Sequence, residues 1–308
     1  MEKNVNPNML QKALPLALCI LALAACSDDD PVRPDNQAVW EWQEVDLGST
    51  AGDSRMLAVD FTGNHGLAVR LIIPDGGGPA GITHEFFRLQ DDTVWMKDDL
   101  GEIRSGFVAM DLALDTTGKC VLAGIQMLGP PSVVLDLRGP EAVYIEQSTY
   151  GMLAVDGEGS FMVAGGRSSG GSLWTSTGPG DWTFDDLPLT GTNDSGFRDV
   201  YIRGDRAVAC GYDDGADTLR VILTRTSTTD WTKIEAGGPF SATYYSIALD
   251  EEGTIYVGGI EGAGSMFPKA FLAQRSVDGL WSDAILPDPD LLHGIMDILI
   301  ASDGSVCL

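Results

Sequence analysis

Basic residues are scarce in this chain. Its 19 lysines and arginines stand against 45 aspartates and glutamates, which gives a formal net charge of −26. Such a surface repels phosphate backbones, so the composition argues against nucleic acid as a partner. We favour the interpretation that the acidity keeps a secreted protein soluble or reflects a salty habitat. The alternative is a surface for cations or for a cationic partner.

Metal-binding patterns are also missing. The three histidines lie far apart in the sequence, at His65, His84 and His293, and no CxxC pair occurs. No metal-ligand spacing is therefore present, and we expect no cofactor. Three cysteines lie on or at the end of expected strands, where we predict buried free thiols that behave as small hydrophobes: Cys120, Cys210 and Cys307.

The common signatures of catalysis are absent too. There is no Gly-x-Ser-x-Gly elbow and no P-loop. The glycine-rich segment Pro74 to Pro79 opens no helix, so we expect a flexible loop rather than a phosphate cradle. Aspartates are so abundant that chance pairs of carboxylates identify no glycosidase site. The sequence therefore favours a protein that is not an enzyme.

The longest hydrophobic run lies near the N-terminus. Lys3 and Lys12 belong to a short polar start, and an apolar stretch follows from Ala13 to Ala25, broken only by Pro15. A run of 13 residues is too short to span a bilayer as a permanent helix, and it suits the core of a signal peptide. We therefore predict that residues 1–25 are a signal peptide.

The end of this run, Leu23-Ala24-Ala25-Cys26, resembles the bacterial lipobox. The resemblance implies that Cys26 is acylated and anchors the chain to a membrane, since two or more acyl chains give stable anchoring. Residues 26–38 then form an acidic, proline-containing tether. Serine rather than aspartate at position 27 implies the outer membrane, and the acidic run resembles a surface-export signal of some lipoproteins. The alternative is an ordinary secretory signal with a chance cysteine.

Glycine, in contrast, is plentiful, with 38 residues, and it marks a repeat. The repeated phrase is clearest in residues 248–259, and six glycines mark its copies: Gly63, Gly118, Gly159, Gly204, Gly253 and Gly304. The steps between them are 55, 41, 45, 49 and 51 residues. A repeat of this length indicates an array of small units, and such arrays usually bind partners.

One repeat contains four expected strands. In the fifth copy they are Tyr244–Asp250, Thr254–Gly258, Ala270–Arg275 and Leu280–Leu286. Four antiparallel strands in about 50 residues make one propeller blade. We predict an all-β fold, a β-propeller of six four-stranded blades over residues 39–308. Fourth-strand aromatics recur and are expected to pack between neighbouring blades: Trp95, Tyr144, Trp182, Trp231 and Trp281.

The two ends of the propeller raise a further expectation. Val39 to Val45 matches a fourth strand that precedes the first repeat, and we expect it to complete the last blade. The sixth blade begins near His293, and the chain stops inside its second strand. We favour a truncated sequence over an incomplete last blade. A parent with seven or eight blades stays open.

Several motifs resemble known propeller repeats. A double glycine followed by a strand and a tryptophan-bearing strand resembles kelch repeats, and the phrase at Asp250 resembles SBBP-type repeats. Residues 276–281 resemble a shortened Asp-box of the BNR repeat, and residues 176–182 are a second copy with Gly178 in place of aspartate. Sialidases share this box and use an arginine triad. Arg198, Arg203 and Arg220 are available for one, but the segment that carries the first arginine is missing.

Loops on one face of the propeller hold the candidate ligand-binding residues: Asp213, Asp214, Asp217, Arg198, Tyr244 and Tyr245. The aspartates between positions 213 and 217 also offer oxygen ligands for calcium, although a solvated turn is the simpler interpretation. We predict a monomeric, lipid-anchored propeller that binds an envelope protein or glycan. The alternatives are a glycan-active or other hydrolytic enzyme with unrecognised catalytic residues, and an assembly or chaperone-like factor.

Overall fold

The computed structural model describes residues 53–308 apart from 76–77, 79–80, 91–93, 102, 128–131, 148–150, 169–171, 186, 190–194, 214–219, 240, 263–267, 285, 287–293 and 302–303. The expected signal peptide, tether and closing strand lie outside these residues. Among the described residues, no helix has the length and apolar character needed to cross a bilayer.

The described residues form five antiparallel units of four strands and one pair of strands, here named blades one to six in chain order. Blade one contains β1 (Asp53–Thr62), β2 (His65–Ile73), β3 (Thr83–Gln90) and β4 (Val94–Asp98). Blade two contains β5 (Phe107–Leu114), β6 (Cys120–Gln126), β7 (Ser132–Asp136) and β8 (Val143–Gln147). Blade three contains β9 (Gly151–Glu158), β10 (Phe161–Ser168), β11 (Ser172–Ser176) and β12 (Thr183–Phe184).

Blade four contains β13 (Ser195–Arg203), β14 (Arg206–Asp213), β15 (Arg220–Thr226) and β16 (Thr232–Ile234). Blade five contains β17 (Ala242–Leu249), β18 (Ile255–Glu261), β19 (Lys269–Arg275) and β20 (Trp281–Asp283). Blade six contains β21 (Leu299–Ile300) and β22 (Val306–Cys307). Blades three and four are joined by a short ladder between β10 and β13.

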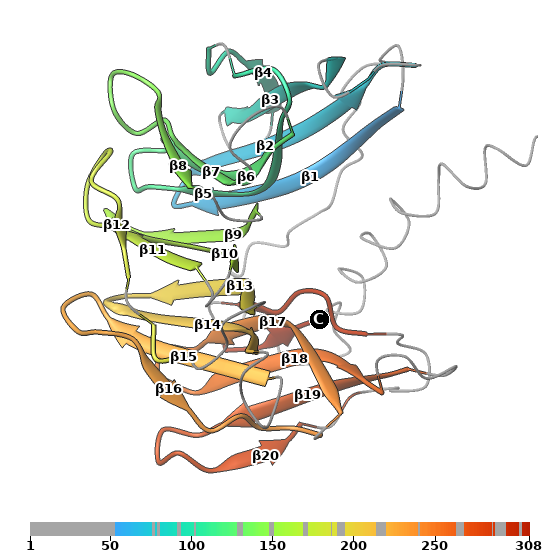
Figure 1. The fold of residues 1–308 in the computed structure, drawn as a ribbon, viewed down its shortest axis with the longest axis vertical. Helices are drawn as coiled ribbons and strands as arrows, with labels where there is room; N and C mark the ends of the chain where they lie inside the picture. The colour runs from blue at the N-terminus through green and yellow to red at the C-terminus, as the bar shows by residue number, and fades with distance from the viewer. Residues whose placement is uncertain are drawn as a thin grey trace, which may run out of the picture.

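The blades follow one another in chain order along an arc (Figure 1). The first strand of each blade packs against the first strand of the next, in the series β1, β5, β9, β13 and β17. Five buried apolar clusters fill the spaces between successive blades. Four-stranded units repeated in this way, with their cores between units, are a β-propeller. The predicted fold class is confirmed.

The six marker glycines lie in the turn between the first and second strand of each blade. All six have a positive φ, from 57° at Gly63 to 97° at Gly253. This backbone conformation favours glycine because a side chain would be strained there. An aspartate further holds two of these turns. The Asp250 carboxylate accepts hydrogen bonds from the backbone N–H groups of Gly253 and Thr254, and the Asp115 carboxylate accepts them from Thr117 and Lys119. The repeated glycine therefore marks the turn between the first and second strand of each blade.

A β-bulge interrupts the first strand of each of blades one to five. Glycines on the second strand face these bulges, and at Gly211 an added Cβ would lie 1.9 Å from the Gly196 carbonyl oxygen. At Gly259 it would lie 2.0 Å from the carbonyl oxygen of Thr243. At these two positions, the space is taken by the bulged backbone of the same blade.

The recurring tryptophans pack between blades, as expected. Each indole N–H reaches the preceding blade: Trp182 donates to Asp136 at 2.9 Å, Trp231 to Asp185 at 3.0 Å, and Trp281 to the Glu235 carbonyl at 2.9 Å. The same three rings join the apolar clusters between blades. They therefore contribute both burial and a fixed direction to each interface.

The Asp-box-like turns are built as the sequence suggests, with one change. In the last copy Ser276 donates to the Asp278 carboxylate and Gly279 has a φ of 89°. In the earlier copy, where Gly178 replaces the aspartate, Asp181 supplies the carboxylate instead. It accepts hydrogen bonds from the Ser176 hydroxyl and the Gly178 N–H, each at 2.7 Å. A carboxylate three residues later thus closes the same turn.

The cysteines divide into two groups. Cys120 and Cys210 are buried free thiols, as predicted. Burial raises the pKa of Cys120 to about 12 and that of Cys210 well above its ordinary value, so both remain protonated thiols. The prediction of a free thiol at Cys307 is wrong, because this residue is disulfide-bonded.

Candidate functional site

The bulges place one extra residue in each first strand, near its middle and in the half away from the glycine turn. In blade four the register shifts between Phe197 and Asp199, so the extra residue is Arg198. In blade five it shifts between Tyr244 and Ser246, so the extra residue is Tyr245. Bulges re-aim side chains and are common next to functional sites. Arg198 and Tyr245 therefore lie on strands at what we call the bulge end of the propeller, and not on loops.

Arg198 and Tyr245 contact each other across the interface between blades four and five. The Arg198 guanidinium carbon lies 4.5 Å from the centre of the Tyr245 ring and 5.9 Å from that of Tyr212. A guanidinium over an aromatic face is attracted by the ring quadrupole. The two rings thus hold the guanidinium in a defined plane.

The Arg198 guanidinium forms no ion pair or hydrogen bond with any other described residue. Other arginines of the described chain are paired, such as Arg138 with Asp136 at 2.8 Å and Arg225 with Asp185 at 2.9 Å. Arg198 is partly exposed, so its N–H donors face a space that a ligand can enter.

The ligand-binding role expected for the Tyr244 side chain is wrong. Tyr244 is 1% exposed and belongs to the apolar cluster between blades four and five. Its hydroxyl donates to the Gly237 carbonyl at 2.6 Å, and the Arg220 guanidinium lies 5.7 Å from its ring centre. Successive residues of a strand point to opposite faces, so Tyr244 faces the interior while its neighbour Tyr245 is partly exposed. Tyr244 therefore belongs to the packed interior between blades four and five.

Asp213 is also buried, with 0% exposure at the end of β14. Its carboxylate accepts a hydrogen bond from the Ser195 hydroxyl and pairs with Lys233, both at 3.3 Å. This position corrects the expectation that Asp213 presents its side chain on a surface loop. Asp214 and Asp217, and with them the proposed calcium ligands, lie outside the described residues. Within the described part of the chain, no group of three or more His, Cys, Asp or Glu is arranged to hold a metal ion.

Arg220 forms the deeper part of the same region. Strand register pairs Tyr212 directly with Arg220, so both side chains lie on one face of blade four. The Arg220 guanidinium donates to the carbonyls of Gly237 at 2.8 Å, Gly238 at 3.1 Å and Pro239 at 2.6 Å. Arg220 therefore fixes the connection between blades four and five. We define the Arg–Tyr cluster as Arg198, Tyr212, Arg220, Tyr244 and Tyr245.

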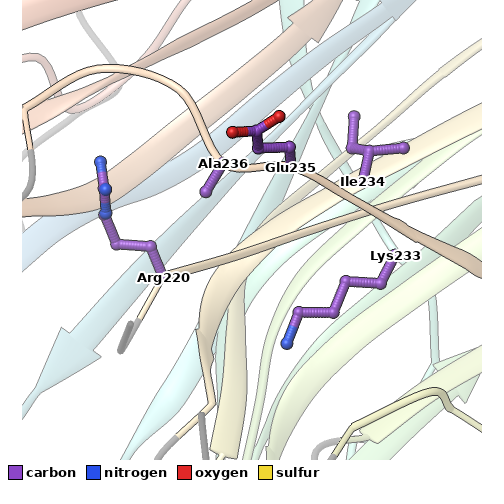
Figure 2. Close-up of a pocket in the computed structure, with 5 residues that line it drawn as sticks. All are labelled: Arg220, Lys233, Ile234, Glu235 and Ala236. Atoms are coloured by element: carbon purple, nitrogen blue, oxygen red, sulfur yellow. The ribbon is translucent and has the colours of Figure 1, made fainter. Parts of the chain in front are cut away.

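A shallow pocket of about 280 Å³ opens beside this cluster (Figure 2). It is lined by Arg220, Lys233, Ile234, Glu235 and Ala236. Two of the lining side chains are cationic and one is acidic, although acidic residues outnumber basic ones more than two to one in the whole chain. The bulge end of blades four and five is thus locally more basic than the composition leads one to expect.

The structure does not bring the three candidate triad arginines together. Arg198 lies at the bulge end, whereas Arg203 lies at the turn end, where it pairs with Glu251 at 2.7 Å. Arg220 is committed to backbone carbonyls. Three arginines that converge on one carboxylate, as in the sialidases that the Asp-box resembles, are therefore not formed by these residues.

Carboxyl groups with raised pKa values occur, but they lie between blades. Burial raises the pKa of Asp156 to about 8 and that of Asp199 to about 7. Asp156 accepts a hydrogen bond from the Ile202 N–H of the next blade at 2.6 Å, and Asp199 accepts one from the Ile247 N–H at 2.8 Å. A carboxyl group that accepts a hydrogen bond from the backbone of the next blade is positioned to hold the two first strands together.

Comparisons with known proteins add the following. No protein family and no curated protein matches the chain. Solved structures of low similarity do. YCF48 bound to D1 peptide is 12% identical, with 78% of this chain and 74% of that chain covered and a TM-score of 0.46. Virginiamycin B lyase from Staphylococcus aureus is 10% identical, with 76% and 71% covered and a TM-score of 0.48.

A third solved structure is a triple-arginine mutant of AofleA from Arthrobotrys oligospora. It is 12% identical, with 84% of this chain and 83% of that chain covered and a TM-score of 0.47. Similarity at this level carries no information on ligand or activity.

Sequence reasoning missed two parts of this site. No sequence motif singles out Tyr212, and its role as a stacking partner depends on strand register. Lys233 and Glu235 follow a fourth-strand tryptophan and carry no motif of their own. A usable signal existed for the bulges of blades two to five, because a glycine of the second strand lies opposite each of them.

Proposed function

We propose that this chain is a lipid-anchored binding module of the cell envelope whose ligand docks at the Arg–Tyr cluster. In this proposal residues 1–25 are removed and Cys26 is acylated at the outer membrane, so no cysteine remains to pair with Cys307, which is a thiol in the mature chain. Residues 26–38 act as the tether, and the propeller acts as a monomer. The observation that carries the docking site is the contact between Arg198 and Tyr245. It holds on a strand pair a guanidinium that pairs with no carboxylate of the described residues, which suits a binding group that is pre-organised.

The docking site is tested by a binding screen of the full chain, processed in its host envelope, against peptide and glycan arrays. We expect signals that disappear in Arg198→Ala and persist in Arg203→Ala, which removes an arginine from the opposite end of the same strand β13. Circular dichroism of both variants checks that they fold. The proposal fails if binding is independent of Arg198, or if glycosidase substrates turn over while nothing binds.

The anchor is tested separately. Cys26→Ala should abolish metabolic labelling with a fatty acid and release the chain from the membrane fraction. Cys19→Ala is the matched control, because this cysteine lies inside the expected signal peptide and should leave both results unchanged. If the Cys26→Ala chain still fractionates with membranes and still carries label, the anchor is elsewhere.

A further inference from the structure

Equivalent bulge residues of the other blades show what surrounds Arg198. The bulges of blades one and two place Leu57 and Met110 at the position that Arg198 and Tyr245 hold in blades four and five. Met296 holds this position in the sequence of blade six. Met110 is 39% exposed and Met296 is 64% exposed. The first strands of blades one to five pack side by side in series, so equivalent residues on them lie at the same level of the propeller. We call them the bulge ring.

Apart from Arg198 and Tyr245, the residues of the bulge ring are apolar. Methionine side chains are flexible and polarisable, and they adapt to apolar side chains of varied shape. Sugar hydroxyl groups, in contrast, need polar partners, and they lose hydrogen bonds when they are placed on methionine and leucine. The chemistry of the ring therefore suits a protein segment better than a glycan.

Arg198 determines the charged group that the ring accepts. A guanidinium presents its N–H donors in a planar fork that matches both oxygens of a carboxylate. The two tyrosines hold this plane before a ligand arrives, so little side-chain entropy is lost on binding. The rest of the chain carries a large negative charge, which repels a partner with many negative groups. One carboxylate in a segment that is otherwise apolar or basic satisfies both conditions.

Building on the proposed docking site, we infer that the bulge ring binds a protein segment with one carboxylate flanked by apolar side chains. The carboxylate lies on the Arg198 guanidinium between Tyr212 and Tyr245. The apolar side chains lie on Met110, Met296 and Leu57. The inferred ligand class adds the requirement of one carboxylate to the docking site proposed above.

The probes are two sets of N-acetylated hexapeptides made of leucine, phenylalanine and valine, with binding measured by fluorescence polarisation on the full chain. One set carries a single carboxylate, either at the C-terminus or as one central glutamate with an amidated end. The other set carries none. We expect the carboxylate set to bind at least about tenfold more tightly, which is ~1.4 kcal/mol. Equal binding of both sets overturns the inference.

Two variants locate the binding. Arg198→Lys keeps the charge but loses the fork, and we expect it to lose most of the preference for the carboxylate peptides. Met110→Glu adds to the ring a negative charge that repels the peptide carboxylate, so it should weaken binding of the carboxylate peptides. Met96 is an exposed methionine on the outer strand β4, and Met96→Glu should leave this binding unchanged. Folded variants that bind as the parent does, or equal effects of the two methionine changes, contradict the inference.

A binding test with an acidic oligosaccharide distinguishes failure of the inferred ligand class from failure of the docking site. Oligogalacturonate is tested beside the peptides, again with Arg198→Ala. If only the oligosaccharide binds, and binding depends on Arg198, the ligand class inferred here is wrong while the docking site stands. If neither probe binds and the array signals do not depend on Arg198, both proposals fail.

Discussion

The Asp111 carboxylate joins blade two to blade three through the Val155 N–H, which donates to its Oδ2 at 2.9 Å. Its other oxygen accepts from Leu112 of its own strand at 2.8 Å. The same arrangement recurs in Asp60 with Leu114, in Asp156 with Ile202 and in Asp199 with Ile247. Four carboxyl groups thus connect the five first strands β1, β5, β9, β13 and β17 in series.

These carboxyl groups predict that the propeller loses stability as the pH rises. Burial raises the pKa of Asp111, Asp156 and Asp199 in the folded state, to about 8 for Asp156 and about 7 for Asp199. The folded state therefore holds more protons than the unfolded state between pH 4 and these values, and the free energy of unfolding falls across that window. Thermal melts at pH 5 and pH 8 should show the higher midpoint at pH 5.

Asp156→Asn separates this effect from general charge repulsion. The amide cannot ionise, so the fall in melting temperature between pH 5 and pH 8 should become smaller than in the parent. Asp53→Asn removes an exposed carboxylate, paired with Arg55 at 3.3 Å, and should leave the parent's slope nearly unchanged. A steeper slope in Asp156→Asn would contradict the account.

The buried ion pair between blades two and three should be costly to break. Asp136 pairs with Arg138 at 2.8 Å, and both side chains are 1% exposed. Asp136 also accepts hydrogen bonds from Gly180 and Trp182 of the next blade, each at 2.9 Å. Asp136→Ala leaves a buried cation without its partner and should lower the free energy of unfolding by about 3–5 kcal/mol. Urea unfolding measures this, with Arg55→Ala as an exposed control expected below about 1 kcal/mol.

The bulges make a prediction about glycine. Gly211→Ala places a Cβ 1.9 Å from the Gly196 carbonyl, so backbone must move in the most buried part of blade four. Gly63→Ala meets open space and suffers only the strain of its positive φ, expected to cost about 1 kcal/mol. Gly211→Ala should destabilise the protein clearly more than Gly63→Ala in urea unfolding. Equal effects would mean that the bulge is not rigid.

The thiols should be inert in the folded protein. Cys120 and Cys210 are 1% and 0% exposed, and burial raises both pKa values. Neither should react with a thiol reagent at pH 8 until the chain is unfolded in guanidinium. Reaction of either residue at the rate of a free thiol in native conditions would show that blade two or blade four opens.

The regular parts of this fold follow from local physics that a sequence displays. The positive φ at Gly63 or Gly253 selects glycine, and indole rings such as Trp231 recur because each blade must cover the next. The bulges are different. They add one residue without changing the apolar pattern of the strand, so Tyr244 and Tyr245 were assigned one role although one is buried and the other is partly exposed.

The contacts of the carboxyl groups between blades also could not be predicted from the sequence. An aspartate inside an apolar strand, as at Asp111 or Asp199, signals a buried partner, but abundant surface acidity hides it. Its partner is a backbone N–H about 45 residues later, which carries no sequence signal at all. Register between blades comes only from the three-dimensional arrangement. For the same reason Tyr212 was not recognised as a neighbour of Arg198.

The central claim is that the bulge end receives the ligand. The most direct measurement is photo-crosslinking in the native envelope, with p-benzoylphenylalanine replacing Met110 in one strain and Val277 in another. Met110 lies in the bulge ring, and Val277 is 64% exposed at the turn between β19 and β20. We predict a defined adduct from position 110 that disappears when Arg198→Ala is added, and none from position 277. An adduct from position 277 alone, or one from position 110 that survives Arg198→Ala, would contradict the account.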